Sequence, residues 1–260
     1  MAAAANASLR MRPQPEARRL AILASAGFGL VLLVVLISVA IRLGQAATPP
    51  LGAGAMFALR AMHRSAASLE VLVVLWLAWL AWRGRRARPA FARGAVLALA
   101  ITLFLSVLGI AAGQSPPPLA AFGNLLGGLA LAVNFAWLAG RLRGNLVGTP
   151  TLVITLGAAL LALQCTLGAR LSVFEGAAGS PALPAHAMLG LLLAAGLFWV
   201  PALRIGRPAW RKAGIPLALI VLLTGFTALQ FEFSRTAAFV HAAAAALLVA
   251  AAAYAHRRLA

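Results

Sequence analysis

Eight apolar runs, each long enough to cross a lipid bilayer, constrain the fold of this chain more than any other feature. A transmembrane helix needs about 20 predominantly apolar residues to cross a hydrocarbon core of about 30 Å. The runs are Leu20–Leu43, Ser65–Trp82, Gly94–Gly113, Leu119–Gly140, Thr151–Arg170, His186–Leu203, Gly214–Phe231 and Ala237–Tyr254. We therefore predict an all-α polytopic membrane protein with eight transmembrane helices.

The composition excludes a soluble protein. Hydrophobic residues make up 63% of the 260 residues and charged residues only 10%, whereas soluble domains carry about 25% charged residues. The formal net charge of +18 would favour nucleic acid in a soluble chain. Here the basic residues lie between apolar runs, so we interpret them as topology signals and expect no nucleic-acid partner. The single cysteine, Cys165, excludes an intrachain disulfide and a cysteine-built metal site.

The basic residues also predict the orientation of the chain. All but five of the 22 lysines and arginines lie in the N-terminal tail (1–19), in the loops after the second, fourth and sixth runs, or at the C-terminus. The five on the other side are Arg42, Arg60, Arg64, Arg170 and Arg235. Cytoplasmic loops carry an excess of basic residues. We therefore expect a multi-pass protein of a bacterial-type inner (plasma) membrane with both termini in the cytoplasm.

The order of the polar residues indicates that a four-helix unit occurs twice. The corresponding pairs are Arg42 with Arg170, His63 with His186, and Asn124 with His241. His63 and His186 open the second and sixth runs, and the third pair lies near the start of the fourth and eighth. Four helices per unit is an even number, so both halves enter and leave the membrane on the same side. We predict two parallel four-helix-bundle repeats, 20–143 and 144–260, related by an axis along the membrane normal.

Two of the four histidines form a candidate metal-binding pair. His186 and His241 begin successive inward-running helices at the same predicted depth, an arrangement by which bundles ligate heme iron from two sides. Zinc requires three or four protein ligands, and no aspartate, cysteine or further histidine lies near this pair. We therefore predict a heme between them; the alternative is that each is a hydrogen-bonded polar residue at the interface. His256, beside Arg257 and Arg258, is expected to be solvated.

These residues, in this order and spacing, resemble the heme A synthase family of cytochrome oxidase assembly enzymes. The matching segments are IRLGQ (41–45), ALRAMHRSAASLE (58–70), GARLS (168–172), LPAHAMLGLLLAAG (183–196) and TAAFVHAAAAAL (236–247). The family oxidises the C8 methyl group of heme O to a formyl group, giving heme A. The resemblance implies a b-type heme ligated by His186 and His241 in the second half. It implies heme O as the substrate in the first half, with His63 as its iron ligand.

The first half departs from the family pattern at three places. Asn124 stands where the family has a second histidine, and an amide is a poor iron ligand. Arg60 stands where the family has a glutamate three residues before the histidine; arginine stays protonated in proteins and cannot act as a base. The cysteine pair that many members carry in the first outer loop is missing.

Three further residues are candidates for the site. Glu70 lies seven residues after His63, so it shares that helix face about 10 Å deeper and is the candidate catalytic carboxylate. The alternative is that Glu70 is protonated or paired and serves helix packing. Arg42 and Arg170 occur in both halves and match heme propionates, which arginine binds bidentately. Extension of both side chains toward the outer interface is the alternative.

Four functions are compatible with these observations to different degrees. The first is an active heme A synthase-like oxidoreductase. The second is a non-catalytic heme-binding relative that acts in oxidase assembly or electron transfer. A transmembrane electron carrier is disfavoured because all interior ligand candidates lie near one face, and a heme-free transporter has little support. The expected partners are membrane lipid, heme, a heme O synthase, oxidase assembly factors and a second copy of the chain.

Overall fold

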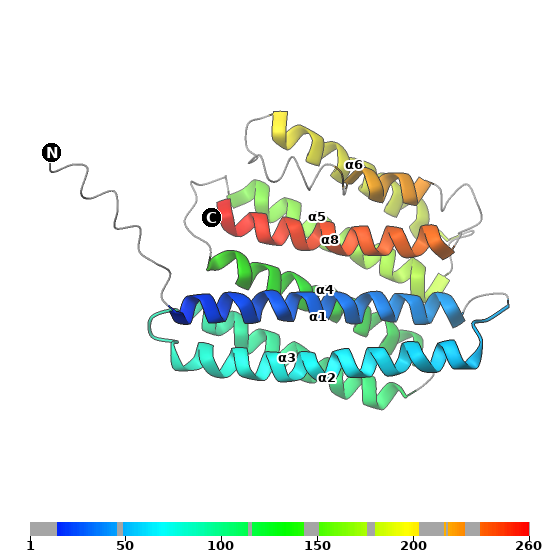
Figure 1. The fold of residues 1–260 in the computed structure, drawn as a ribbon. Helices are drawn as coiled ribbons and strands as arrows, with labels where there is room; N and C mark the ends of the chain where they lie inside the picture. The colour runs from blue at the N-terminus through cyan, green and yellow to red at the C-terminus, as the bar shows by residue number, and fades with distance from the viewer. Residues whose placement is uncertain are drawn as a thin grey trace.

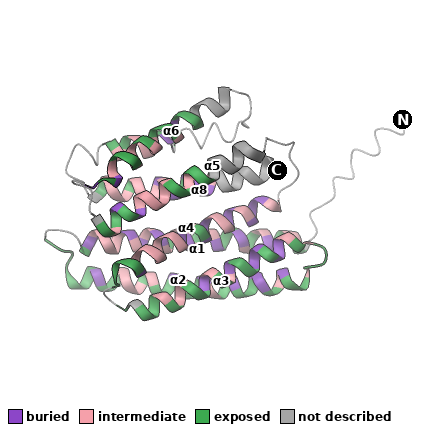
Figure 2. Cartoon of the chain, turned by 180° about the vertical axis from the view of Figure 1, so that it is seen from behind, coloured by how far each residue is buried: buried purple, intermediate pink, exposed green. Residues whose placement is uncertain are grey.

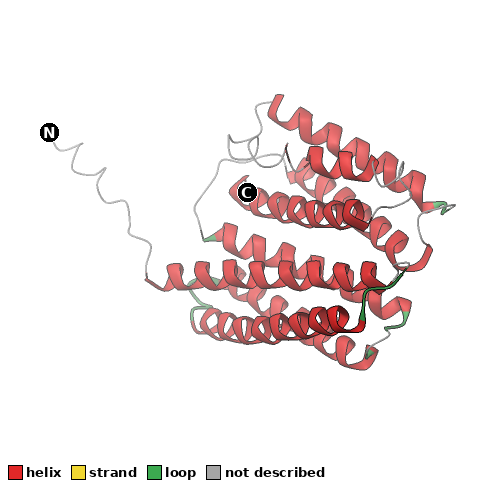
Figure 3. Ribbon diagram, turned by 45° about the vertical axis from the view of Figure 1, so that its right-hand side comes forward, coloured by secondary structure: helices red, strands yellow, loops and turns green. Residues whose placement is uncertain are grey.

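Every regular element that the computed structural model describes is a helix (Figure 3). The described residues are 15–45, 49–113, 116–142, 151–175, 180–202, 216, 218–226 and 235–259. The elements are α1 (Pro15–Gln45), α2 (Ala53–Arg83), α3 (Pro89–Ala112), α4 (Pro118–Arg141), α5 (Thr151–Arg170), the short π-helix η2 (Leu171–Glu175), α6 (Ala182–Ala202) and α8 (Arg235–Leu259). Residues 218–226, within the seventh predicted run, are also helical. The tail before residue 15, the basic segment 204–212 and the rest of the seventh run lie outside the described residues.

Proline and glycine set the helix ends, as their backbone properties require. Pro89 and Pro118 occupy the first positions of α3 and α4, where the N–H that proline lacks has no helical partner. Gly84 ends α2 and donates its N–H to the Leu80 carbonyl at 3.2 Å. Gly113 ends α3 with φ of +62°, a left-handed conformation that glycine adopts without strain.

The first four helices form a closed antiparallel bundle. α1 and α3 each lie between α2 and α4, and the chain runs back and forth along one axis (Figure 1). All four are long and apolar enough to cross a membrane. Shorter apolar helices follow at Ala159–Phe174, Ala182–Gly196 and Thr236–Ala251 within the described part of the second half. The prediction of an all-helical fold is therefore confirmed for the described residues, and four of its helices have the length and apolarity of membrane spans.

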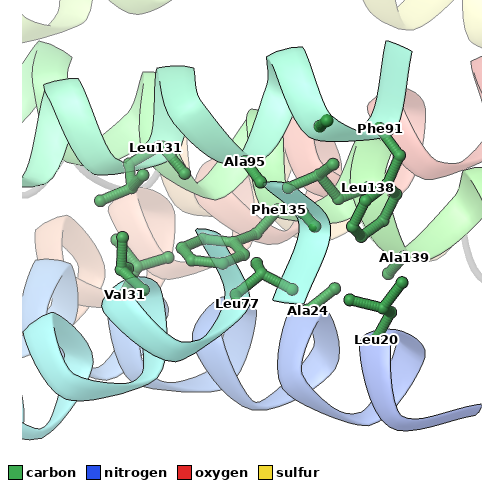
Figure 4. Close-up of a cluster of buried hydrophobic side chains, with 14 of the residues drawn as sticks. Leu20, Ala24, Val31, Leu77, Phe91, Ala95, Leu131, Phe135, Leu138 and Ala139 are labelled. Atoms are coloured by element: carbon green, nitrogen blue, oxygen red, sulfur yellow. The ribbon is translucent and has the colours of Figure 1, made fainter. Parts of the chain in front are cut away.

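A tightly packed apolar core occupies the half of this bundle nearest the start of α1. Figure 4 shows Phe135 of α4 pointing toward Val31 of α1 and Leu77 of α2. Phe135 and Leu77 are fully buried, and Val31 is 1% exposed. The other labelled members of this core are Leu20, Ala24, Phe91, Ala95, Leu131, Leu138 and Ala139. The core holds the four helices in one register.

Glycines allow α4 to approach its neighbours closely. A methyl group added at Gly94 of α3 would lie 2.7 Å from the Trp137 ring, and one at Gly128 would lie 2.8 Å from Val35. The side chain of Phe135 packs directly against Gly27 of α1. Small residues are common at membrane helix interfaces because lipid supplies no hydrophobic drive for association, so close van der Waals packing replaces it.

The outward faces of the bundle are apolar and exposed. Large apolar side chains on the outside of α2 and α3 include Trp76, Trp79, Phe104 and Ile110, each more than half exposed (Figure 2). Contiguous apolar surface of this kind is rare on soluble monomers. Lipid contact therefore explains it, and this agrees with the four membrane-length helices.

The second half contacts the first mainly through α4. α8 lies against α4 and α1, while α5 lies against α6 and α4. The Phe122 and Phe174 rings, from α4 and η2, pack edge to face with centroids 5.5 Å apart. Arg42 at the end of α1 donates a hydrogen bond to Ser172 at 3.3 Å. The two ends that were matched by sequence, those of α1 and α5, thus meet in space.

The even-numbered helices all begin at one end of the molecule, which we call the histidine end. The starts of α2, α6 and α8 lie together in Figure 1, and the start of α1 and the end of α8 lie at the opposite end. Several predicted boundaries are wrong by five residues or more, including the starts of α1 (Pro15 rather than Leu20) and α3 (Pro89 rather than Gly94). The largest difference is at α2. α2 begins at Ala53 rather than Ser65, so His63 lies in its third turn. The polar residues Arg60, His63 and Arg64 interrupt the apolar run but not the helix, because none of them breaks helical hydrogen bonding.

The contact between Gly27 and Phe135 is testable by one added methyl group. We expect Gly27→Ala to lower the free energy of unfolding in detergent by about 1–3 kcal/mol, because the methyl group overlaps the buried ring. Gly29→Ala is the matched control, since no atom lies within 4 Å of its added methyl group. Equal thermal-unfolding shifts in the two variants would show that α1 and α4 do not pack as described.

Candidate functional site

Three histidines near the histidine end each contact the preceding helix. His63 Nδ1 lies 3.3 Å from Ser38 Oγ of α1. His186 Nε2 lies 3.4 Å from Gln164 Nε2 of α5. His241 Nδ1 lies 3.0 Å from the carbonyl oxygen of Val221, in the helical segment 218–226. Each of the three histidine side chains thus contacts the helix that precedes its own helix in the chain.

The surroundings of His241 fix the position of its ring proton. Because a carbonyl oxygen only accepts hydrogen bonds, Nδ1 carries the proton and donates it to Val221. The lone pair on Nε2 is then available to bind a metal. A histidine that ligates a metal almost always donates its other N–H to a carbonyl, carboxylate or water. His241 therefore has the hydrogen bonding of a metal ligand.

His186 differs because one of its nitrogens has no partner. His186 Nδ1 and Gln164 Oε1 are both buried without a hydrogen bond among the described residues. Buried polar atoms are nearly always satisfied, and exceptions are frequent at sites that bind something else. One nitrogen of His186 thus faces a protein group, and the other faces none among the described residues.

The two rings lie together although their helices do not pack closely. The centroids of His186 and His241 are 6.1 Å apart, with an angle of 68° between the ring planes, whereas the α6 and α8 backbones are not close neighbours. A metal–imidazole nitrogen bond is about 2.0–2.1 Å long, so two rings on opposite sides of one metal have centroids about 6 Å apart. The spacing fits a shared metal.

Two glycines on the preceding helices leave the space that the rings occupy. A methyl group added at Gly168 of α5 would lie 2.9 Å from His186 Cε1. One added at Gly225 would lie 3.2 Å from His241 Cε1. A larger residue at either position would displace a ring, so both glycines are part of the site.

The donor set fits heme better than a metal ion held by protein alone. In the described parts of the chain, no three His, Cys, Asp or Glu side chains come together. A protein-bound zinc needs three or four such ligands, while heme brings four nitrogens of its own and needs one or two more. Bound to a heme, His186 and His241 would supply two nitrogen ligands and no negative charge.

In the first half, His63, Ser38 and Asn124 lie at one depth. Gly128 packs against Val35 across α1 and α4. Asn124 lies one turn before Gly128 in an antiparallel helix, so it reaches the level of Ser38, the contact of His63. The half-buried residues His63 and Asn124 therefore lie at one level of the first bundle.

Glu70 lies deeper and is almost fully buried. It is 4% exposed, as is Thr102 of α3, and the hydroxyl of Thr102 has no partner among the described residues. By the antiparallel register, Val31 of α1 lies at the same level. Glu70 is about 10 Å below His63 along α2, as the sequence predicts. A carboxyl group among apolar side chains inside a membrane helix is costly and functional by default.

The paired arginines occupy the histidine end, but they differ in their contacts. Arg42 is half-buried and hydrogen-bonds Ser172, whereas Arg170 is exposed. The two therefore do not repeat one environment.

The sequence patterns did not indicate Gln164 or the glycines Gly168 and Gly225 as site residues. The signal available for the glycines is their placement 18 residues before His186 and 16 residues before His241, in the preceding run.

Comparison of the sequence with models of known protein families gave no match, and comparison with curated proteins gave none either. The functional argument therefore depends on the fold and on the geometry of these residues.

Proposed function

We propose that this chain is an integral membrane heme protein of the heme A synthase type, with a b-type heme between His186 and His241. The observation that carries the proposal is the pair of imidazoles from α6 and α8 with centroids 6.1 Å apart. The Val221 carbonyl supports it by orienting His241. A heme bound there supplies one-electron chemistry, and the protein holds and orients it.

We infer the membrane arrangement from the same observations. The four long helices and the shorter apolar helices of the second half are consistent with eight spans in two parallel repeats. The basic residues at the end opposite the histidines favour a cytoplasmic location for that end and for both termini. The heme then lies near the outer face of a bacterial-type inner membrane.

Oxidation of heme O to heme A is the second candidate function, with the substrate in the first half. The observation that favours it is the environment of His63, which contacts the Ser38 hydroxyl of the preceding helix, much as His241 contacts the Thr224 hydroxyl. With Asn124 in place of a second histidine, His63 is the single ligand that this half offers. Glu70 is the proposed catalytic carboxylate. A heme O synthase and oxidase assembly factors are the proposed partners.

The ligand assignment predicts different spectra for three histidine variants. His186→Ala and His241→Ala are expected to abolish the low-spin b-type spectrum of the purified protein, because each removes one axial nitrogen. His63→Ala is the control and is expected to keep that spectrum, since His63 lies in the other half. An unchanged spectrum in both second-half variants would overturn the proposed heme site.

The glycine next to His186 gives a subtler test. We expect Gly168→Ala to weaken heme retention about tenfold, because its methyl group would lie 2.9 Å from His186 Cε1 and shift the ring. Gly196→Ala on α6 is the control, with no atom within 4 Å of the added methyl group. Retention is measured by transfer of heme to apomyoglobin. Equal transfer rates in both variants would contradict the placement of His186 against α5.

The second candidate function predicts the identity of the extracted heme. When the protein is co-expressed with a heme O synthase, a pyridine hemochrome spectrum is expected to show heme A. Cells that contain the synthase alone are the control and are expected to show heme O without heme A. Heme B alone in the purified protein would contradict oxidation and leave the heme-binding role in place.

A further inference from the structure

The side chain of Gln164 on α5 lies against α6, next to the ring of His186 and to Gly190. Its Nε2 is 3.4 Å from His186 Nε2. A methyl group added at Gly190, one turn after His186, would lie 3.0 Å from the same amide nitrogen. The absence of a side chain at Gly190 therefore makes room for the amide. Gln164 is held between this glycine and the ring.

The amide of Gln164 has two orientations with opposite effects on the ring. With its NH2 group toward His186, the amide donates to the Nε2 lone pair, and the ring proton lies on Nδ1 without an acceptor. With its oxygen toward the ring, the amide accepts a proton from Nε2, and the lone pair on Nδ1 is free. Rotation of the Gln164 side-chain amide by half a revolution interconverts these two orientations.

His241 has no such alternative. Its Nδ1–H is donated to the backbone carbonyl of Val221, which belongs to a helix and cannot turn. The two histidines thus differ in kind: one has its tautomer fixed by backbone, and the other has it set by a side chain. His186 Nδ1 and Gln164 Oε1 are both buried without a hydrogen-bond partner in the described structure. This is expected where a side-chain amide, and not a backbone carbonyl, contacts the ring.

We propose that Gln164 is the positioning residue that decides whether His186 acts as an iron ligand. With the amide oxygen toward the ring, His186 ligates through its free nitrogen. With the amide nitrogen toward the ring, the amide competes for the lone pair and favours release. His186 is then the exchangeable ligand of the pair and His241 the permanent one. This inference rests on the proposed function and adds to it a place where a small neutral molecule binds iron.

The test compares two substitutions that act in opposite directions on the same ring. The ionised carboxylate of Gln164→Glu has only acceptors, so at a pH where it is ionised it holds the ring N–H, strengthens His186 as a ligand, and lowers the affinity of the reduced protein for carbon monoxide about tenfold. Gln164→Leu removes the acceptor and raises that affinity about tenfold. Carbon monoxide is titrated into the reduced, purified full-length protein and binding is followed by absorbance. Shifts in the same direction would indicate a packing role only and overturn the inference.

Two further variants make the test specific. Thr166→Val is the control on the same helix, because the Thr166 hydroxyl is exposed and bonds only to Ala162 of its own helix; its carbon monoxide affinity is expected to be that of the wild type. Gly190→Ala displaces the Gln164 amide without a buried charge and is expected to match Gln164→Leu, even where Gln164→Glu does not fold.

The outcomes separate this inference from the proposed function. A wild-type protein with a low-spin heme and one carbon monoxide affinity across all variants would overturn the role of Gln164 and leave the heme site in place. A wild-type protein that binds no heme would overturn the proposed function itself. Opposite shifts for glutamate and leucine would support both.

Discussion

Close packing of α4 against its neighbours is the interaction on which the rest of the structure depends. α4 contacts α1 and α3 through Gly94, Gly128 and the Phe135–Gly27 pair, and it also carries the surface against which α8 lies. In lipid, apolar side chains gain nothing by leaving the solvent, so helix association depends on how closely backbones approach. By fixing α4, these glycines fix the level of His241 on α8. The place of His241, and with it the proposed heme site, therefore depends on packing in the first half.

The histidines show how a membrane helix places a polar ring with few polar residues. Each ring takes its partner from the backbone or a short polar side chain of the preceding helix: Ser38, Gln164 or Val221. A helix carbonyl near the ring costs no extra buried polar residue, since it accepts a second hydrogen bond. A glycine on that preceding helix leaves the space that a larger side chain would take from the ring. This pairing of an imidazole with a glycine-backed helix recurs at His186 and His241.

The sequence contained enough information for the all-helical fold and for its apolar helices of membrane length. Apolar run length predicted the helices, and the boundaries of α5 agree exactly with the expected Thr151–Arg170. The early start of α2 was missed because run length follows hydropathy, whereas a helix continues through Arg60 and His63 as long as its hydrogen bonds are kept. Gln164 was missed for another reason. Its importance comes from the register of α5 against α6, a tertiary property that no local pattern records.

The packed core of the first bundle makes the two ends of this bundle different. Phe91, Leu77, Phe135 and Leu138 fill the half farthest from the histidines, each 2% exposed or less. Ser38 and His63 lie on the side of this core nearer the histidine end, and Glu70 lies at its edge, level with Val31. Any path into this bundle from the histidine end would therefore end at the packed core.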